Sequence, residues 1–183
     1  MSRLLALGLL LSVCCLPVWA EDLKSGLPVG SAPMPFHLLN VVNADDSSLN
    51  GKEACLVCQY GAKPVVLVFA RCCDCSSTAA LAKKLDTAVA KVGKDKMSAA
   101  LVFMTESPEM AQKLQSFAGK NELKNVSLAV MGPNGPDGYK INDKAGVTVL
   151  MYRNRKVIAN HAFDSMCETC VEKVVADLTK VMG

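Results

Sequence analysis

The sequence lacks most of the patterns that mark nucleic-acid surfaces, hydrolytic sites and nucleotide sites. Its formal net charge is only +3 at pH 7, so composition gives no argument for a nucleic-acid partner or an acidic one. Acidic residues are scattered without a paired-carboxylate pattern. The glycines of residues 132–138 do not match a phosphate-binding loop, because no strand-to-helix turn surrounds them. We also find no internal repeat and no low-complexity tract.

Histidine is scarce as well. The two histidines, His37 and His161, each lie in an apolar segment, and neither is near a cysteine in sequence. We expect both to be ordinary strand residues. About half of the residues (51%) are apolar, which suits one globular domain with a sizeable core.

The N-terminus has the pattern of a secretory signal peptide. A basic residue, Arg3, precedes a short apolar run, and a small-residue cleavage site follows at residues 18–20. We predict that residues 1–20 are removed after Ala20; an uncleaved anchor is the alternative. The apolar run is too short for a comfortable membrane span. The sequence therefore predicts an exported protein, periplasmic or extracellular, without stable membrane insertion after cleavage.

Cysteine is abundant, with nine in 183 residues. In a cytosolic protein this number suggests metal binding or catalysis, and in an exported one disulfides as well. Removal of the signal peptide takes away Cys14 and Cys15; a lipoprotein cut before either of them is less favoured, because valine stands where a small residue is wanted. The other seven form three groups: Cys55 and Cys58; Cys72, Cys73 and Cys75; Cys167 and Cys170. Seven is odd, so at least one thiol is free or pairs with another molecule.

The strongest structural pattern surrounds the central cysteines. Residues 64–70 are a continuous valine-rich run, typical of a strand buried on both faces. Residues 76–92 place apolar side chains on one helical stripe. Cys72, Cys73 and Cys75 lie between this strand and this helix. Because a helix N-terminus carries partial positive charge and free N–H groups, it stabilises a thiolate and raises its reactivity.

The rest of the chain alternates strands and helices. One helix is expected to start at Ser107-Pro108-Glu109, where serine suits the N-cap and proline the first helical position. A last helix is expected at the capping box from Ser165 to Glu168. The remaining predicted strands are residues 36–42, 99–104, 126–131, 147–152 and 157–163, the last two joined as a hairpin. Helical connections between strands predict an α/β fold, with a central mixed sheet, helices on its faces and an antiparallel hairpin edge.

The strand, cysteines and helix resemble a unit of the thioredoxin fold. PVVLVFARCCDC, followed by an amphipathic helix, is similar to that fold's strand–CxxC–helix unit. The lead-in GLPVGSAPMPFHLLNV, and the strand at residues 126–131 before GPNGPDGYKINDKAGVTVLMY, resemble the redoxin branch of peroxiredoxin-like and exported thioredoxin-like proteins. The resemblance implies a thioredoxin-like three-layer sandwich with helices on both faces of the sheet. Its domain is residues 36–183, after a lead-in of residues 21–35.

The resemblance also implies a function. A protein of this kind exchanges disulfides with disulfide- or thiol-bearing partner proteins and needs no bound organic cofactor. In the CxxC register, Cys72 attacks the partner and Cys75 resolves the mixed disulfide. Counting from Phe69 against the thioredoxin pattern instead places Cys73 at the nucleophile position and Ser76 at the resolving one. Peroxidase activity has little support, because the proline and threonine upstream of a peroxiredoxin's reactive cysteine are absent.

Two features of the site depart from the family pattern. Arg71 stands where thioredoxins carry tryptophan and should favour a thiolate, whereas Asp74 should disfavour it. The segment that usually holds a cis-proline is Val147-Thr148-Val149, without proline. A non-proline cis bond costs about 3 kcal/mol, so we expect a trans bond here.

Each cysteine group also has a structural interpretation. The central group is otherwise a static disulfide or a thiol cluster that binds copper or zinc. Cys55 and Cys58 suit a small structural disulfide, because no helix N-terminus is evident beside them; a redox pair that relays electrons to the main motif is the alternative. Cys167 and Cys170 are buried hydrophobes or a surface disulfide, or they join Cys55 and Cys58 in a four-thiolate zinc site. The rival function is thus a non-catalytic thioredoxin-like binding module that uses its cysteines structurally or for a metal ion.

Overall fold

A seven-stranded sheet organises the computed structural model, which describes residues 23–182. The predicted signal peptide, with Cys14 and Cys15, lies outside these residues. The strand order is β2-β1-β5-β4-β3-β6-β7. The strands are β1 (Leu38–Val42), β2 (Glu53–Ala54), β3 (Val65–Ala70), β4 (Ser98–Met104), β5 (Val126–Met131), β6 (Val147–Arg153) and β7 (Lys156–Phe163).

The sheet is mixed, as predicted. Strand β3 runs parallel to β4 and antiparallel to β6, and β5 runs parallel to β4. Both edges are antiparallel, with β7 beside β6 and with β1 between β5 and β2. The predicted hairpin between β6 and β7 is confirmed. Its two turn residues, Asn154 and Arg155, have φ of 52° and 55°, the left-handed pair of a type I′ turn.

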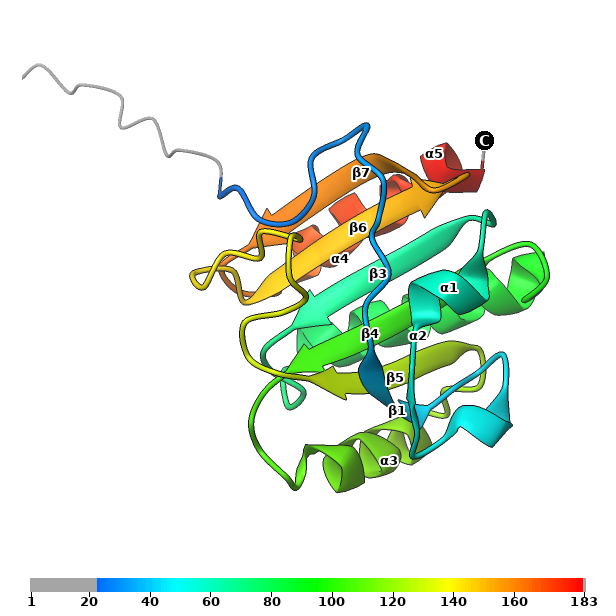
Figure 1. Cartoon of the computed structure of the whole chain (residues 1–183), viewed down its shortest axis with the longest axis vertical. Coiled ribbons are helices and arrows are strands. Elements are labelled where there is room, and N and C mark those ends of the chain that lie inside the picture. The colour runs from blue at the N-terminus through cyan, green and yellow to red at the C-terminus, as the bar shows by residue number, and fades with distance from the viewer. Residues whose placement is uncertain (1–22, 183) are drawn as a thin grey trace, which may run out of the picture.

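The helices cover the two faces unequally. The helices are α1 (Leu56–Tyr60), α2 (Ser76–Val92), α3 (Met110–Lys120), α4 (Glu168–Ala176) and α5 (Leu178–Met182). The crossovers through α2 and α3 step along the sheet in the same direction, so right-handed connections place both helices on one face. Helices α4 and α5 share that layer, and α1 lies on the opposite face (Figure 1). The predicted arrangement of helices on both faces is therefore confirmed.

Strand β3 is buried on both sides. All six of its residues are buried, as the valine-rich run predicts. Because side chains alternate along a strand, Val66 and Val68 pack with α2, while Leu67 and Phe69 pack on the opposite face, with α1. The strand that leads to the central cysteines is thus held from both faces.

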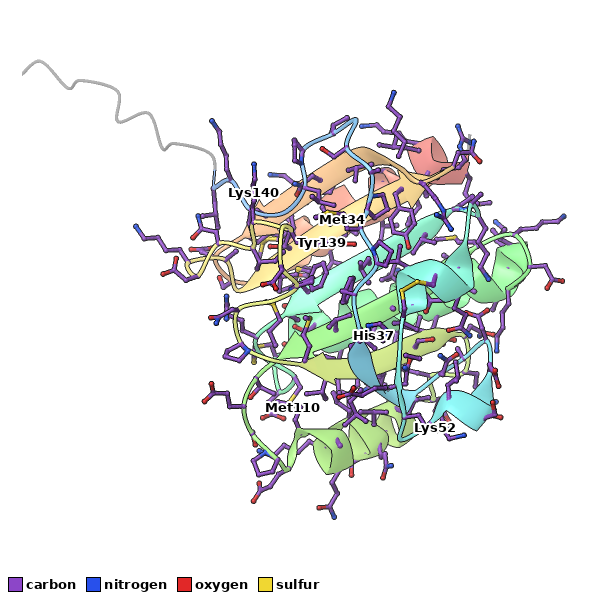
Figure 2. All side chains as sticks on the ribbon, viewed as in Figure 1. Met34, His37, Lys52, Met110, Tyr139 and Lys140 are labelled. Atoms are coloured by element: carbon purple, nitrogen blue, oxygen red, sulfur yellow. A yellow bond between two sulfur atoms is a disulfide. The ribbon has the colours of Figure 1, made fainter. Side chains whose placement is uncertain are left out.

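The lead-in packs against the sheet. The hydroxyls of Ser25 and Thr148 are hydrogen-bonded at 2.6 Å, and the Gly30 amide donates to the Val157 carbonyl at 2.8 Å. The Tyr139 hydroxyl donates to the Met34 carbonyl at 2.7 Å, and Figure 2 shows these two residues together over the α1 face. This segment and the loop of residues 132–146 complete the layer that α1 only partly covers.

Three helix ends differ from the prediction. Helix α3 begins at Met110 rather than at the Ser107 cap, after a turn in which the Met110 amide donates to the Ser107 carbonyl. The capping box at Ser165 does not form, because Cys167 is the N-cap of α4. The last helix also breaks at Asp177, whose carboxylate lies 3.1 Å from His161 Nε2. Within residues 23–182, no helix has the length and apolarity needed to cross a bilayer.

Candidate functional site

The central cysteines lie in a five-residue loop between β3 and α2. Cys72 and Cys75 form a disulfide with a Cα–Cα distance of 6.1 Å. Cys72 is exposed and Cys75 is half-buried. Cys75 is also the N-cap of α2, and its carbonyl accepts the amides of Thr78 and Ala79 at 3.0 and 3.2 Å. The structure therefore pairs the two cysteines of the CxxC register. Cys75, rather than Cys72, lies at the N-terminus of α2.

Cys73 is separate from this disulfide. It is the free thiol among residues 23–182 and is only 7% exposed. Burial raises the pKa of the Cys73 thiol, the Asp74 carboxylate raises it further, and Lys113 opposes these effects weakly. Cys73 is therefore protonated near neutral pH and a poor nucleophile. The geometry does not favour the alternative register, in which Cys73 attacks and Ser76 resolves.

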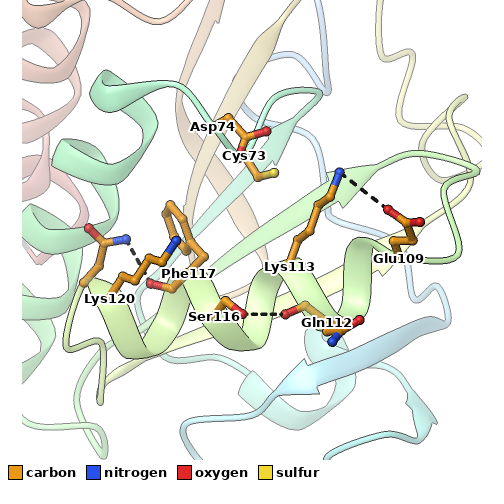
Figure 3. A pocket seen from close by; sticks show the side chains of 9 residues that line it. Cys73, Asp74, Glu109, Gln112, Lys113, Ser116, Phe117 and Lys120 are labelled. Atoms are coloured by element: carbon orange, nitrogen blue, oxygen red, sulfur yellow. Dashed lines mark hydrogen bonds and ion pairs between the residues drawn. The ribbon is translucent and has the colours of Figure 1, made fainter.

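A cleft of about 360 Å³ opens beside Cys73, between the motif loop and α3. Figure 3 shows the Cys73 sulfur directed toward α3, where Lys113 and Phe117 line the cleft. Lys113 pairs with Glu109 at 3.9 Å. The rim is therefore polar and of mixed charge.

Arg71 anchors the loop of residues 132–146 to the end of β3. Its guanidinium donates to the carbonyls of Ala145 at 3.1 Å and Pro133 at 2.7 Å. Its backbone amide donates to the Gly146 carbonyl at 3.0 Å. The sequence predicted that Arg71 would favour a thiolate, whereas its hydrogen bonds in the structure go to loop carbonyls.

Gly146 joins the motif to the segment before α4. Its carbonyl accepts from Arg71, and its amide donates to the Asp164 carbonyl at 3.1 Å. A Cβ at this position would overlap the Asp164 carbonyl oxygen, so only glycine fits without a backbone shift. The following segment, Val147-Thr148-Val149, lies in β6, and no cis peptide bond occurs within residues 23–182.

The second cysteine pair lies across the sheet from the motif. Cys55 and Cys58 form a disulfide, and Cys55 is the N-cap of α1. The expectation that no helix begins beside Cys55 was therefore wrong. A helix of five residues spans little more than one turn, so its apolar periodicity does not show in the sequence.

The third pair lies at the N-terminus of α4. Cys167 and Cys170 form a disulfide, with Cys167 as the N-cap and Cys170 only 8% exposed. Because α1 and α4 cover opposite faces, the structure does not bring this pair together with Cys55 and Cys58. The hypothesis of one four-cysteine site is thus contradicted. No group of three or more His, Cys, Asp or Glu residues suited to a metal occurs within residues 23–182.

Sequence reasoning missed a polar cluster behind the site. His161 lies 3.1 Å from Asp177, which also pairs with Lys180 at 2.7 Å. Asp177 is 16 residues from His161 in sequence, and no local pattern marks such a contact. His161 lies within β7, as predicted, and its ring also contacts the Asp177 carboxylate, whereas the exposed His37 immediately precedes β1 rather than lying in it.

Comparison with solved structures shows a shared fold. A protein from Chlorobium tepidum, provisionally assigned as the thiol:disulfide interchange protein DsbE, aligns with 86% of this chain and 99% of its own, at 17% identity and a TM-score of 0.63. The peroxidoxin BcpB of Mycobacterium tuberculosis aligns with 83% of this chain and 96% of its own, at 16% identity and a TM-score of 0.56. A secreted disulfide oxidoreductase of M. tuberculosis, homologous to E. coli DsbE, aligns with 79% and 95%, at 14% identity and a TM-score of 0.52.

These neighbours include both disulfide-exchange and peroxiredoxin-type proteins, the two kinds of protein that the sequence resemblance implied. No protein-family model matches the chain, and no curated protein matches it in sequence. At such identities the likeness concerns the fold, so the argument for function rests on the cysteines themselves.

Proposed function

Because the chain has the thioredoxin-like fold, we propose that it is an exported thiol–disulfide oxidoreductase that acts through Cys72 and Cys75. One observation carries the proposal: an exposed Cys72 is bonded to a half-buried Cys75 that caps the 17-residue helix α2. An exposed sulfur can meet a partner, and a sheltered one can resolve the resulting bond.

The reaction moves two electrons and two protons. The Cys72 thiolate attacks one sulfur of a partner disulfide, and the partner's other sulfur leaves as a thiolate and takes up a proton. Cys75, as a thiolate, then attacks Cys72 Sγ, which releases the partner as a dithiol and forms the Cys72–Cys75 disulfide. Cys75 Sγ accepts no cap hydrogen bond in the disulfide form, and the dipole of α2 favours negative charge on Cys75 once the bond is open. The reverse sequence oxidises a partner dithiol, and no organic cofactor takes part in either direction.

Export is the second part of the proposal. It rests on the signal-peptide pattern of residues 1–20. The oxidation state of the cysteines supports export, since six of the seven cysteines within residues 23–182 are in disulfides. Disulfides persist in oxidising compartments.

A matched pair of variants tests the function. Cys72→Ser should lose the dithiothreitol-driven reduction of insulin, because the attacking sulfur is gone. Cys73→Ser should retain it, because that thiol is buried and outside the disulfide. Circular dichroism should show both variants folded. Loss in Cys73→Ser with retention in Cys72→Ser would make Cys73 the nucleophile. Full turnover in both would remove the catalytic role of this motif.

Gly146 favours a second candidate, a non-catalytic binding module with structural disulfides. Its amide and carbonyl are both bonded within the chain, beside the segment where the family's cis-proline contributes to partner binding. A Cys72–Cys75 bond that resists a glutathione or thioredoxin buffer would support this candidate over the oxidoreductase.

A further inference from the structure

We propose that Cys167–Cys170 is a second redox-active pair, which exchanges its disulfide with Cys72–Cys75 across the groove between α2 and α4. The inference rests on the proposed function, because the first pair must itself be redox-active. It assigns a chemical role to the third cysteine group, which sequence alone left as buried hydrophobes, a surface disulfide or zinc ligands.

The first turns of α2 and α4 line one groove. This groove, of about 490 Å³, has α2 residues on one wall and α4 residues on the other: Ser76, Ser77, Ala80 and Lys84; Glu168, Val171 and Glu172. Ser76 directly follows Cys75, and Glu168 directly follows Cys167. The N-termini of the two helices, each capped by a disulfide cysteine, therefore lie side by side.

Gly146 couples the two cysteine segments through its backbone. Arg71, which precedes Cys72, donates to the Gly146 carbonyl, and the Gly146 amide donates to the Asp164 carbonyl. Asp164 begins the short segment that ends at Cys167. Neither residues 71–74 nor residues 164–166 belong to a helix or strand. Each segment can therefore move its sulfur toward the other without breaking a regular element.

The local chemistry of Cys167 suits exchange. Cys167 Sγ accepts the Cys170 amide at 3.2 Å and lies 3.2 Å from Thr169 Oγ1. It is half-buried and caps a nine-residue helix, while Cys170 behind it is buried. The outer sulfur is the accessible one and has donors for negative charge, which is the arrangement that thiol exchange needs.

The Cys55–Cys58 pair shares the cap hydrogen bond, because Cys55 Sγ accepts the Cys58 amide at 3.1 Å, but its second cysteine is exposed rather than buried. The pair lies on the opposite face of the sheet, at the start of a helix of only five residues. The sequence offered this pair as the relay to the main motif. The structure favours Cys167–Cys170 for that role and provides Cys55–Cys58 as an internal control.

The exchange balances within the chain. With the first pair reduced, the Cys72 thiolate attacks Cys167 Sγ and the Cys167–Cys170 bond breaks, so that Cys170 leaves as a thiolate and takes up a proton. Cys75 then gives up its proton and attacks Cys72 Sγ, which breaks the Cys72–Cys167 bond and leaves Cys167 as a thiol. The first pair is oxidised and the second is reduced, by two electrons and two protons.

Trapping the mixed disulfide tests the proposal. In a Cys75→Ser/Cys170→Ser protein neither resolving sulfur is present, so oxidation with diamide should accumulate a Cys72–Cys167 bond. The control protein is Cys75→Ser/Cys58→Ser/Cys167→Ser/Cys170→Ser, which leaves Cys55 as the unpaired partner and removes the proposed acceptor pair. Tandem mass spectrometry of the tryptic peptides would identify the bond and distinguish Cys72 from Cys73. Because proximity within one chain raises effective concentration, we expect at least about tenfold more Cys72–Cys167 than Cys72–Cys55.

A second measurement uses the unaltered protein. One equivalent of a phosphine reductant is added, samples are quenched with acid over time, and the free thiols are alkylated and mapped. Thiols that redistribute between the two pairs, with a Cys72–Cys167 intermediate, support the relay. The relay is overturned if the thiols stay in the pair first reduced, or if trapping yields no excess over the Cys55 control.

Failure of the relay and failure of the proposed function give different results. If only the relay fails, the Cys167→Ser/Cys170→Ser protein reduces insulin at the same rate as the unaltered protein, and no Cys72–Cys167 bond is trapped. If the proposed function fails, the unaltered protein itself does not accelerate insulin reduction. Slower turnover in Cys167→Ser/Cys170→Ser, together with the trapped bond, supports both.

Discussion

Gly146→Ala should destabilise the protein more than the addition of one methyl group suggests. The new methyl group would overlap the Asp164 carbonyl oxygen, which is backbone and cannot rotate away. Relief requires a backbone shift that weakens the Gly146–Asp164 and Arg71–Gly146 hydrogen bonds, 3.1 and 3.0 Å long. Each such bond contributes about 1 kcal/mol, and displaced packing adds a similar amount, so we expect a loss of about 2–4 kcal/mol.

Urea unfolding followed by far-UV circular dichroism measures this loss. The single tryptophan, Trp19, lies in the predicted signal peptide, so fluorescence is a weak probe. The midpoint should fall with an unchanged slope. The matched control is Gly119→Ala in α3, where a Cβ meets nothing within 4 Å. Because alanine favours a helix, this variant should gain about 0.5–1 kcal/mol.

The two variants separate the explanations. If Gly146→Ala is no less stable than Gly119→Ala, the contact between residue 146 and Asp164 is not a rigid constraint. In the trapping experiment, Gly146→Ala should also lower the yield of the Cys72–Cys167 bond, because the segment before α4 would move. An unchanged yield would mean that Gly146 does not couple the two segments.

Three other substitutions test local electrostatics. Asp86, on α2, accepts the backbone amides of residues 124–126 at 2.6–3.2 Å, so Asp86→Asn should cost about 1.5–3 kcal/mol in urea unfolding; a smaller loss would make the interaction incidental. Cys73, with its raised pKa, should be alkylated more slowly than free cysteine at pH 8, and Asp74→Asn should move its rate profile to lower pH. If the pH profile of alkylation does not move, burial alone raises the pKa of Cys73. The pKa of Asp177 is held below 3.8, first by the Lys180 hydrogen bond. A carboxyl with a lowered folded pKa stabilises above its unfolded pKa, and this stability is lost as the pH falls through the folded value. The unaltered protein should therefore lose more stability than Asp177→Asn as the pH falls below about 4, and equal losses would contradict this.

Much of the fold could be predicted because its main elements carry their own pattern. The buried run of β3 and the apolar stripe of α2 are visible in consecutive residues. Helix α1 could not be predicted, since five residues show no helical period. The capping box at Ser165 failed for another reason. The Cys167–Cys170 bond forms the first turn of α4, and Cys167 Sγ takes the cap position that the serine was expected to fill.

The candidate site was only partly predictable, because it depends on distant segments. The CxxC spacing indicated that Cys72 could pair with Cys75. It did not indicate that Arg71 would bond the loop of residues 132–146, or that Gly146 would hold Asp164 close by. The strand order decides which cysteine pair lies on the same face of the sheet as α2, the helix that follows the motif. Cys167–Cys170 lies on the α2 face, and Cys55–Cys58 lies on the other.

The three disulfides within residues 23–182 share a short span: each joins residues three apart in sequence. In the chain-entropy model a cross-link stabilises a protein by restricting its unfolded chain, and a four-residue ring restricts it by only about 2 kcal/mol, against nearly 5 for a hundred-residue ring. None of the three bonds ties together segments distant along the chain; the sheet does that. Opening any one of them therefore leaves the topology intact, and the protein can change its oxidation state without unfolding.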